Sequence, residues 1–172
     1  MVAIKRWFRH AFMPPWRWRL LFSKSVLLDI EQAIQCSEQQ HSAELRFVVE
    51  NTLALSKVWR GMTAGQRALD LFSALRVWDT EQNSGVLIYL LLADRELHIV
   101  ADRGIKKYVP QAEWDAIAAG MQKEFQRGDF RHGSLQGIER MTQLLSAHFP
   151  PSADDQNELP NSPVIIKSHR LG

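Results

Sequence analysis

The chain has 172 residues, a length that a single domain normally fills. Hydrophobic residues make up 45% and charged residues 23%, a balance that excludes a disordered chain and predicts a globular fold. The single cysteine, Cys36, excludes an internal disulfide, and no metal-type Cys or His spacing surrounds it. We therefore expect Cys36 to be a small helix residue of a protein in a reducing compartment.

The net charge of +2 hides an uneven distribution of charge along the chain. Residues 1–28 contain no acid and six bases, which are Lys5, Arg6, Arg9, Arg17, Arg19 and Lys24. The other residues carry 15 bases and 19 acids, so the basic start is a separate feature. The sequence thus predicts a basic, aromatic N-terminal segment over 1–24, a domain over 25–150 and a flexible tail over 151–172, which is polar and interrupted by prolines.

The N-terminal segment is not predicted to be a signal peptide, because it lacks an uninterrupted apolar run and a small-residue cleavage site. Pro14 and Pro15 should break any helix in its middle. The longest apolar run of the chain, 86–93, has the length of a strand and is too short to span a bilayer. These features predict a protein that does not cross a membrane.

The domain reads as a succession of helices and strands. Apolar residues at helical spacing predict helices over 25–40, from Thr63 to about Trp78, over 110–128 and over 134–149. Thr63 and Gln66 form a capping box at the start of the second helix. Alternating residues predict a strand over 44–50, and 86–92 followed by 96–101 predicts a hairpin. The run 86–92 has no polar alternation, so it must be a central strand covered on both faces.

Several segments together resemble the TPM domain family over about residues 25–150. They are Glu44-Leu-Arg-Phe-Val-Val, the run from Asn83 to Arg95, His98-Ile-Val-Ala-Asp-Arg-Gly-Ile105, and Phe125-Gln-Arg-Gly-Asp-Phe130 with Gly133 and Gly137. The resemblance implies an α/β fold, a three-layer α/β/α sandwich whose small mixed sheet contains a central buried β-hairpin. It also implies binding of divalent cations, calcium among them, and the acid phosphatase activity with which some members are labelled. The longer relatives begin with an Asp-Asp-Ala-Gly-type segment, and we find none in this sequence.

Four residues are candidate metal ligands. Asp79, Glu81 and Asn83 stand at positions one, three and five of a calcium-loop spacing. The rest of the loop pattern fails, because Ser84 replaces its Gly and Leu90 its bidentate Glu. Asp102 ends the strand that pairs with the strand after Asn83, so the two should converge. The four residues predict a Ca²⁺ or Mg²⁺ site, and the alternative is an ordinary turn with solvated loop acids.

Motifs of known phosphatases are otherwise missing. Arg131-His132-Gly133 matches the tripeptide of histidine phosphatases, but it follows a helix and lacks the neighbouring arginine. We interpret it as a coincidence, with the glycines at 128, 133 and 137 serving a tight turn between helices. No cysteine phosphatase loop, aspartate motif, Walker loop or nucleophile elbow is present.

The basic N-terminal segment is a candidate membrane contact. Trp and Arg favour the headgroup region of a bilayer, and each cation near an anionic surface contributes about 1 kcal/mol. The candidate residues are Lys5, Arg6, Trp7, Arg9, Trp16, Arg17, Trp18 and Arg19. The alternative is that these aromatic residues pack on the domain or on a protein partner. No nucleic-acid partner is expected, because the rest of the chain is acidic and carries no such motif.

These readings favour a TPM-type accessory or binding module on the cytoplasmic face of a membrane, with divalent-cation binding. The alternative is a divalent-metal-dependent acid phosphatase. An enzyme needs converging carboxylates around a space for phosphate, whereas a module needs only an exposed patch. The sequence specifies no oligomeric state and no particular partner.

Overall fold

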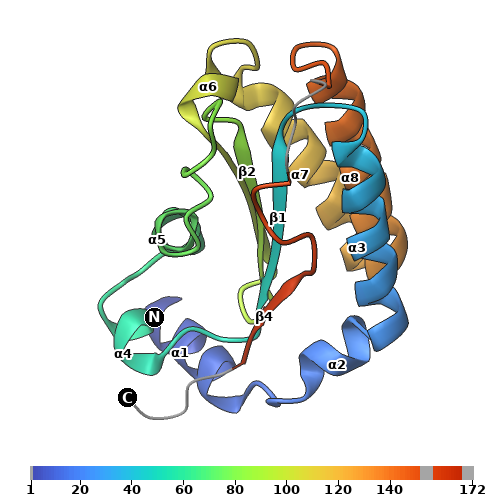
Figure 1. The fold of residues 1–172 in the computed structure, drawn as a ribbon. Coiled ribbons are helices and arrows are strands. Elements are labelled where there is room, and N and C mark those ends of the chain that lie inside the picture. Colours follow the sequence, from blue (N-terminus) through green and yellow to red (C-terminus); the bar gives the residue numbers. More distant parts are fainter. Residues whose placement is uncertain (1, 152–156, 168–172) are drawn as a thin grey trace.

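The computed structural model describes residues 2–151 and 157–167 and shows three layers, with helices on both faces of one sheet (Figure 1). The sheet has the strand order β3-β2-β1-β4. β1 pairs in parallel with β2 and with β4, and β2 pairs antiparallel with β3. The strands are β1 (Glu44–Glu50), β2 (Gly85–Leu91), β3 (Glu96–Ala101) and β4 (Val164–Ile166).

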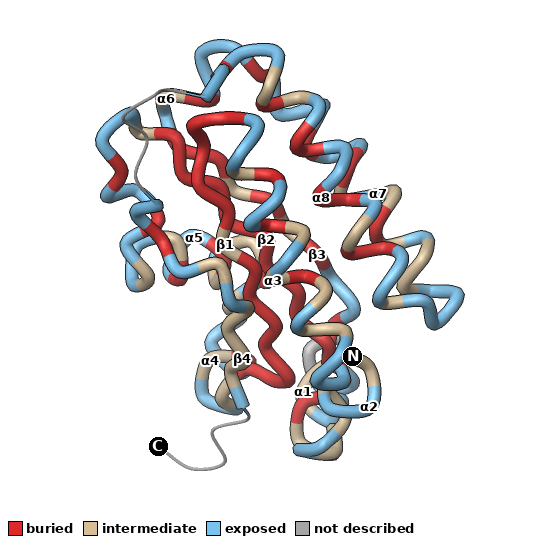
Figure 2. The backbone as a smooth tube through the Cα atoms, turned by 45° about the vertical axis from the view of Figure 1, so that its right-hand side comes forward, coloured by how far each residue is buried: buried red, intermediate tan, exposed pale blue. Residues whose placement is uncertain are grey.

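β2 is the interior strand that the sequence predicts. All seven of its residues are buried, and Figure 2 shows β1 and β2 as the most continuously buried part of the chain. Its side chains alternate between two separate cores: Ile88 and Leu90 belong to one, Leu87 and Tyr89 to the other. Both faces are covered, and this explains why the segment shows no polar alternation. β3 completes the predicted hairpin as the edge strand, and its residues alternate in exposure.

Three long helices cover one face of the sheet: α3 (Lys24–Glu38), α7 (Gln111–Gln126) and α8 (Phe130–Ser146). α7 and α8 pack so closely that a Cβ on Gly137 would lie 2.4 Å from the sulfur of Met121. Glycine at this position permits the close approach. Gly128 forms the turn between them with a φ of 88°. α8 begins at Phe130, four residues earlier than predicted, because the Asp129 carboxylate caps the first turn by accepting from the His132 N–H.

Two shorter helices cover the other face, α4 (Leu55–Trp59) and α5 (Ala64–Ala74), and α1 (Val2–Phe12) packs beside α4. The capping box of Thr63 and Gln66 is present at the start of α5. α5 ends at Ala74 instead of the predicted Trp78, since Arg76 takes a left-handed conformation. This turn buries Val77 against the start of β2, where a Cβ on Gly85 would lie 1.8 Å from the Val77 carbonyl oxygen.

The described parts of both terminal segments pack on the domain. α1 and α2 (Arg17–Leu21), separated at Pro14 and Pro15 as the sequence predicts, lie across the end of the sheet where β1 and β2 finish (Figure 1). Residues 164–166, inside the segment predicted to be a flexible tail, form β4 beside β1. Glu44 and Arg46 on β1 hold this segment by hydrogen bonds to the backbone of Glu158, Leu159, Pro160 and Ser162. The sequence pattern does not predict this strand, because three residues with turns on both sides carry too little periodicity.

Candidate functional site

Two of the predicted metal ligands lie together at the amino end of β2, next to α6 (Arg103–Lys106). Arg103 connects them, since its Nε donates to Oδ1 of Asn83 at 2.9 Å and its backbone N–H donates to Oδ1 of Asp102 at 2.6 Å. The Gly104 N–H also donates to the Asn83 carbonyl oxygen at 3.1 Å. The convergence expected from the hairpin is therefore present, but a guanidinium occupies the amide oxygen that would face a cation.

The other two predicted ligands do not complete a metal site. Asp79 and Glu81 are exposed, and the backbone N–H of Glu81 donates to both carboxylate oxygens of Glu158 at 3.1 Å. Across residues 2–151 and 157–167, no group of three or more His, Cys, Asp and Glu side chains could hold a metal ion. As arranged here, the four residues do not together form a calcium or magnesium site, and the predicted site stays a prediction without support from their geometry.

The Arg-His-Gly tripeptide has structural roles. Arg131 forms an ion pair with Asp29 on α3, with Nε 2.6 Å from Oδ2. His132 is exposed in the first turn of α8, and Gly133 lies so close to Phe125 that a Cβ would come within 2.8 Å of its ring. Arg131 and Gly133 therefore have pairing and packing roles between helices.

A buried ionic cluster fixes α1 to the opposite, carboxyl end of the sheet. Arg6 pairs with Asp94 in the β2–β3 turn, with Nη2 2.7 Å from Oδ2. Nδ1 of His10 accepts from the Leu53 N–H at 3.0 Å, so its other ring nitrogen carries the proton and faces Oδ1 of Asp94 at 3.2 Å. Burial alone would raise the pKa of Asp94, but His10 and Arg6 outweigh it and lower the pKa to about 2.

The predicted membrane-contact residues divide into two groups. Lys5, Arg9, Trp16 and Arg19 are exposed, whereas Arg6, Trp7, Arg17 and Trp18 are half-buried. Trp7 packs against the core beneath α5, and Trp18 packs against the core beneath α8. Two of the three tryptophans thus contact the domain, as the alternative expects, and contact with a membrane stays a prediction.

The apolar residues that this segment does expose recur at every fourth position. We call them the N-terminal stripe, and their exposed fractions are Ile4 57%, Phe8 49%, Phe12 74%, Trp16 59% and Leu20 75%. In α1 this spacing places side chains on one helical face, and the rings of Phe8 and Phe12 stack with centroids 5.8 Å apart. The sequence prediction favoured tryptophans and cations, so it named only Trp16 among the five stripe residues. The four-residue spacing of these apolar side chains was a signal that could have identified the others.

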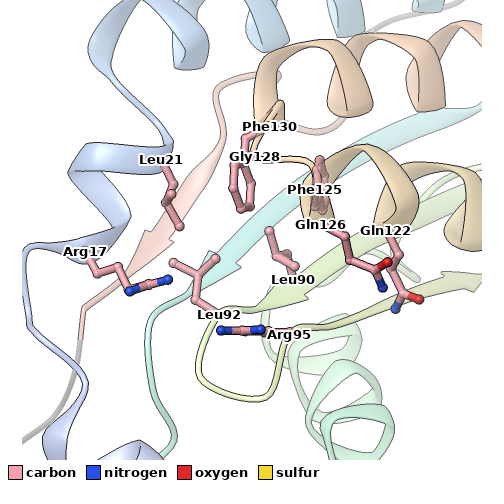
Figure 3. A pocket seen from close by; sticks show the side chains of 10 residues that line it. All are labelled: Arg17, Leu21, Leu90, Leu92, Arg95, Gln122, Phe125, Gln126, Gly128 and Phe130. Carbon is pink, nitrogen blue, oxygen red and sulfur yellow. The ribbon is translucent and has the colours of Figure 1, made fainter.

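A cavity of about 390 Å³ opens beside α2 at the carboxyl end of β2 (Figure 3). Its apolar wall combines four elements, and Figure 3 shows the guanidinium groups of Arg17 and Arg95 extending toward Leu92. A second cavity of about 500 Å³ adjoins it and shares both arginines. No residue that lines either cavity is acidic. The first is lined by Arg17, Leu21, Leu90, Leu92, Arg95, Gln122, Phe125, Gln126, Gly128 and Phe130.

A buried chain of hydrogen bonds links α3 to α8 near the start of β1. The Ala43 N–H donates to Nδ1 of His41 at 3.2 Å, so the proton of the ring lies on Nε2, 2.7 Å from the Ser37 hydroxyl. Ser37 in turn lies 2.6 Å from the Thr142 hydroxyl, which donates to the Ile138 carbonyl. Burial lowers the pKa of His41 to about 4. His41 donates toward Ser37 and does not accept its proton, so this arrangement does not activate a nucleophile.

A second buried polar group lies under α5. Arg67 binds Glu50 with two hydrogen bonds, Nε to Oε2 at 2.9 Å and Nη2 to Oε1 at 3.0 Å, and the Tyr89 hydroxyl donates to Oε2 at 2.6 Å. Burial and the Glu50 carboxylate both raise the pKa of Tyr89, so its hydroxyl stays protonated. The three groups satisfy one another and fasten α5 to β1 and β2.

The fold and the site define an α/β/α sandwich domain with a basic cavity at the carboxyl end of its sheet and a hydrogen-bonded polar loop at the other end. The family model of the TPM domain matches residues 20–144, and the chain belongs to the TPM domain family. The resemblance seen in the sequence is thereby confirmed.

Solved structures agree with this assignment. The BA42 protein from the psychrophilic bacterium Bizionia argentinensis is 31% identical, with a TM-score of 0.74 over 83% of this chain and 94% of that one. The N-terminal domain of a protein from P. gingivalis shares the fold at 19% identity, with a TM-score of 0.61 over 75% of this chain and 79% of that one. No curated protein matches the chain. None of the helices in the described ranges has the length and apolar character needed to cross a membrane.

Proposed function

We propose that this TPM domain is an accessory module that binds the surface of an anionic membrane through the N-terminal stripe, on the cytoplasmic face. The observation that carries the proposal is the stripe itself, five large apolar side chains that are about half exposed or more, in a segment without an acid before Asp29. Large exposed apolar patches rimmed by polar residues mark interaction surfaces.

The surroundings of the stripe suit anionic lipid. Lys5, Arg9, Arg19 and Lys24 are exposed in the same segment, and each cation contributes about 1 kcal/mol at an anionic surface. Because Arg6 and His10 fix α1 to the sheet through Asp94, the stripe residues Ile4, Phe8 and Phe12 are presented on a helix that is held in place. A preformed helix avoids the cost in conformational entropy of ordering a free peptide at the membrane.

The test is sedimentation of the full chain with vesicles of phosphatidylglycerol and phosphatidylcholine. Ile4→Ser/Phe8→Ser should reduce the bound fraction at least tenfold, because it removes two exposed apolar anchors without touching the Asp94 cluster. Leu69→Ser/Trp78→Ser is the matched control, since both side chains are about as exposed but lie outside the segment. Equal loss in both double variants, or binding that is the same on pure phosphatidylcholine, would reject the proposal.

One observation favours the alternative, a divalent-metal-dependent acid phosphatase. Oδ2 of Asp102 is buried without a hydrogen-bond partner among the described residues, and Asn83 lies beside it through Arg103. A phosphatase assay with and without Ca²⁺ or Mg²⁺ tests this function. Activity that needs the metal and is lost in Asp102→Asn, which keeps the capping oxygen, would support it. Activity that is absent, or unchanged in the variant, would count against it.

A further inference from the structure

The apolar wall of the 390 Å³ cavity is preformed. Leu90 lies near the end of β2, Leu92 directly after it, and Leu21 on α2. Phe125 and Phe130 stand on either side of the α7–α8 turn. The two phenylalanine rings stack with centroids 4.9 Å apart, and all five residues belong to or pack on the same core. An apolar ligand would therefore meet a wall that is already in place, in a volume within the range of ordinary small-molecule sites.

The arginines at this wall are not engaged elsewhere. Neither Arg17 nor Arg95 forms a side-chain hydrogen bond or an ion pair with any residue that the structure describes. In contrast, Arg6, Arg67 and Arg131 each pair with a carboxylate. Two guanidinium groups that face one cavity without an acid in its wall attract an anion, and their planar donors suit carboxylate or phosphate oxygens.

Two acids flank Arg95 in the sequence, Asp94 and Glu96, and neither pairs with it. Glu96 is about half exposed and lies 3.3 Å from Nε2 of His98. Asp94 is engaged on the other side of the turn. Its side chain is 1% exposed and pairs with Arg6 and His10, while Arg9 approaches its Oδ1 at 3.4 Å. The carboxylate is thus neutralised on the α1 side of the turn. Arg17 and Arg95 keep their charge available at the mouth of the cavity.

We propose that this cavity binds a single-chain anionic amphiphile. The alkyl chain lies against Leu21, Leu90, Leu92 and the two phenylalanines, and a phosphate or carboxylate head lies between Arg17 and Arg95. The amide groups of Gln122 and Gln126 on the rim are further donors for the head. Lipids and soluble metabolites share this chemistry. The site does not rest on the membrane proposal, because no stripe residue lines the 390 Å³ cavity. Phe12 lines the second cavity, but Ile4 and Phe8, the residues that the vesicle test changes, line neither.

Calorimetric titration of the full chain with decyl phosphate, below its micelle concentration, tests the proposal. Inorganic phosphate and decyl maltoside separate the contributions of head and chain, and each should bind at least tenfold more weakly. Affinity should rise about fourfold per methylene from hexyl to decyl phosphate. If inorganic phosphate binds as tightly as decyl phosphate, or the neutral maltoside does, the proposal is overturned.

Variants locate the ligand. Arg17→Gln/Arg95→Gln should weaken decyl phosphate binding at least tenfold, because charge-assisted hydrogen bonds are lost. Arg19→Gln/Lys24→Gln removes the same charge from residues that line neither cavity and should bind like wild type. Wild-type affinity in the Arg17/Arg95 double variant, or a tenfold loss in the Arg19/Lys24 double variant, would contradict the proposed binding site.

A second, isosteric pair keeps the test decisive if the arginine variant folds poorly. Gln122→Glu places a negative charge on the rim and should weaken binding severalfold, whereas Gln136→Glu, exposed on α8 outside the cavity, should not. Equal binding by both would overturn the proposal. Ile4→Ser/Phe8→Ser should bind decyl phosphate normally, so a failure of the membrane proposal and a failure of this one give different results.

Discussion

The two ends of the sheet use charged side chains in opposite ways. At the amino end of β2, Asn83 and Asp102 are joined through Arg103, and the polar groups of the loop are largely used by the loop itself. At the carboxyl end, Asp94 in the β2–β3 turn pairs with Arg6 and His10 of α1. Arg17 and Arg95 line a cavity and pair with no described side chain. The comparison teaches that charged side chains without a partner in the fold mark the better candidate site. The number of charged residues at each end does not.

The largest expected effect comes from removing Asp94, which anchors α1 to the carboxyl end of the sheet. Asp94→Ala leaves Arg6 and His10 facing a buried gap, so we expect a loss of about 3 kcal/mol in the free energy of unfolding. Urea unfolding followed by circular dichroism measures it. Glu96→Ala is the control, because that side chain lies two residues further along and is 51% exposed, so its loss should change stability by less than about 0.5 kcal/mol. Similar losses in the two variants would mean that the Asp94 cluster does not anchor α1.

The pH dependence of stability tests the amino end, where His41 lies just before β1. The pKa of His41 is about 4 in the folded chain and 6.5 in the unfolded chain. Above pH 6.5 both states are neutral at this residue; between 6.5 and 4 only the unfolded state takes up the proton. Stability should therefore fall as the pH drops through this window, by up to about 3 kcal/mol.

Thermal or urea unfolding across this pH window measures the effect, and His41→Gln provides the comparison. The variant cannot titrate at this position, so its stability should vary less between pH 6.5 and 4 than that of the wild type. Asp94 contributes mainly at lower pH, because its pKa is 3.8 in the unfolded chain and about 2 in the folded chain, so its stabilisation is lost as the pH falls from 3.8 toward 2. Parallel curves for the two proteins would show that His41 is not the source of the pH dependence.

The smallest expected effect concerns the loop that was predicted to bind metal. Asp102→Ala removes the cap of α6 and should cost about 1 kcal/mol, while Asp102→Asn should retain most of the stability. Chemical unfolding of both variants measures the difference. The cost should be smaller than that of Asp94→Ala, since Asp102 accepts one backbone N–H, that of Arg103, whereas Asp94→Ala leaves two buried side-chain partners without their acid. A loss larger than that of Asp94→Ala would reverse the comparison between the two ends.

Much of the fold could be predicted from the residues. The unbroken apolar run of β2 specifies an interior strand, and Thr63 with Gln66 specifies the start of α5. Pro14 and Pro15 separate α1 from α2. These signals are local, because they depend on periodicity, capping and backbone geometry within a few residues.

The candidate site could be predicted only in part. The approach of Asn83 and Asp102 follows from the hairpin, but the sequence does not show that Arg103 would occupy the space between them. The basic start was visible, yet nothing local distinguishes Arg6, which pairs with Asp94 88 residues away, from Arg17, which pairs with no described side chain. Such differences depend on partners that are distant in the chain.

The sequence by itself determined the family, the class of fold and the position of the central strand. The strand could be located because a strand that is buried on both faces is apolar at every position. Only the tertiary structure decided which tryptophans are buried, that 164–166 adds a strand, and that two arginines remain over an apolar cavity. The physical reason is that the exposure and the ion pairing of a side chain depend on residues that are distant in the sequence. The order of the residues does not specify which of them come into contact.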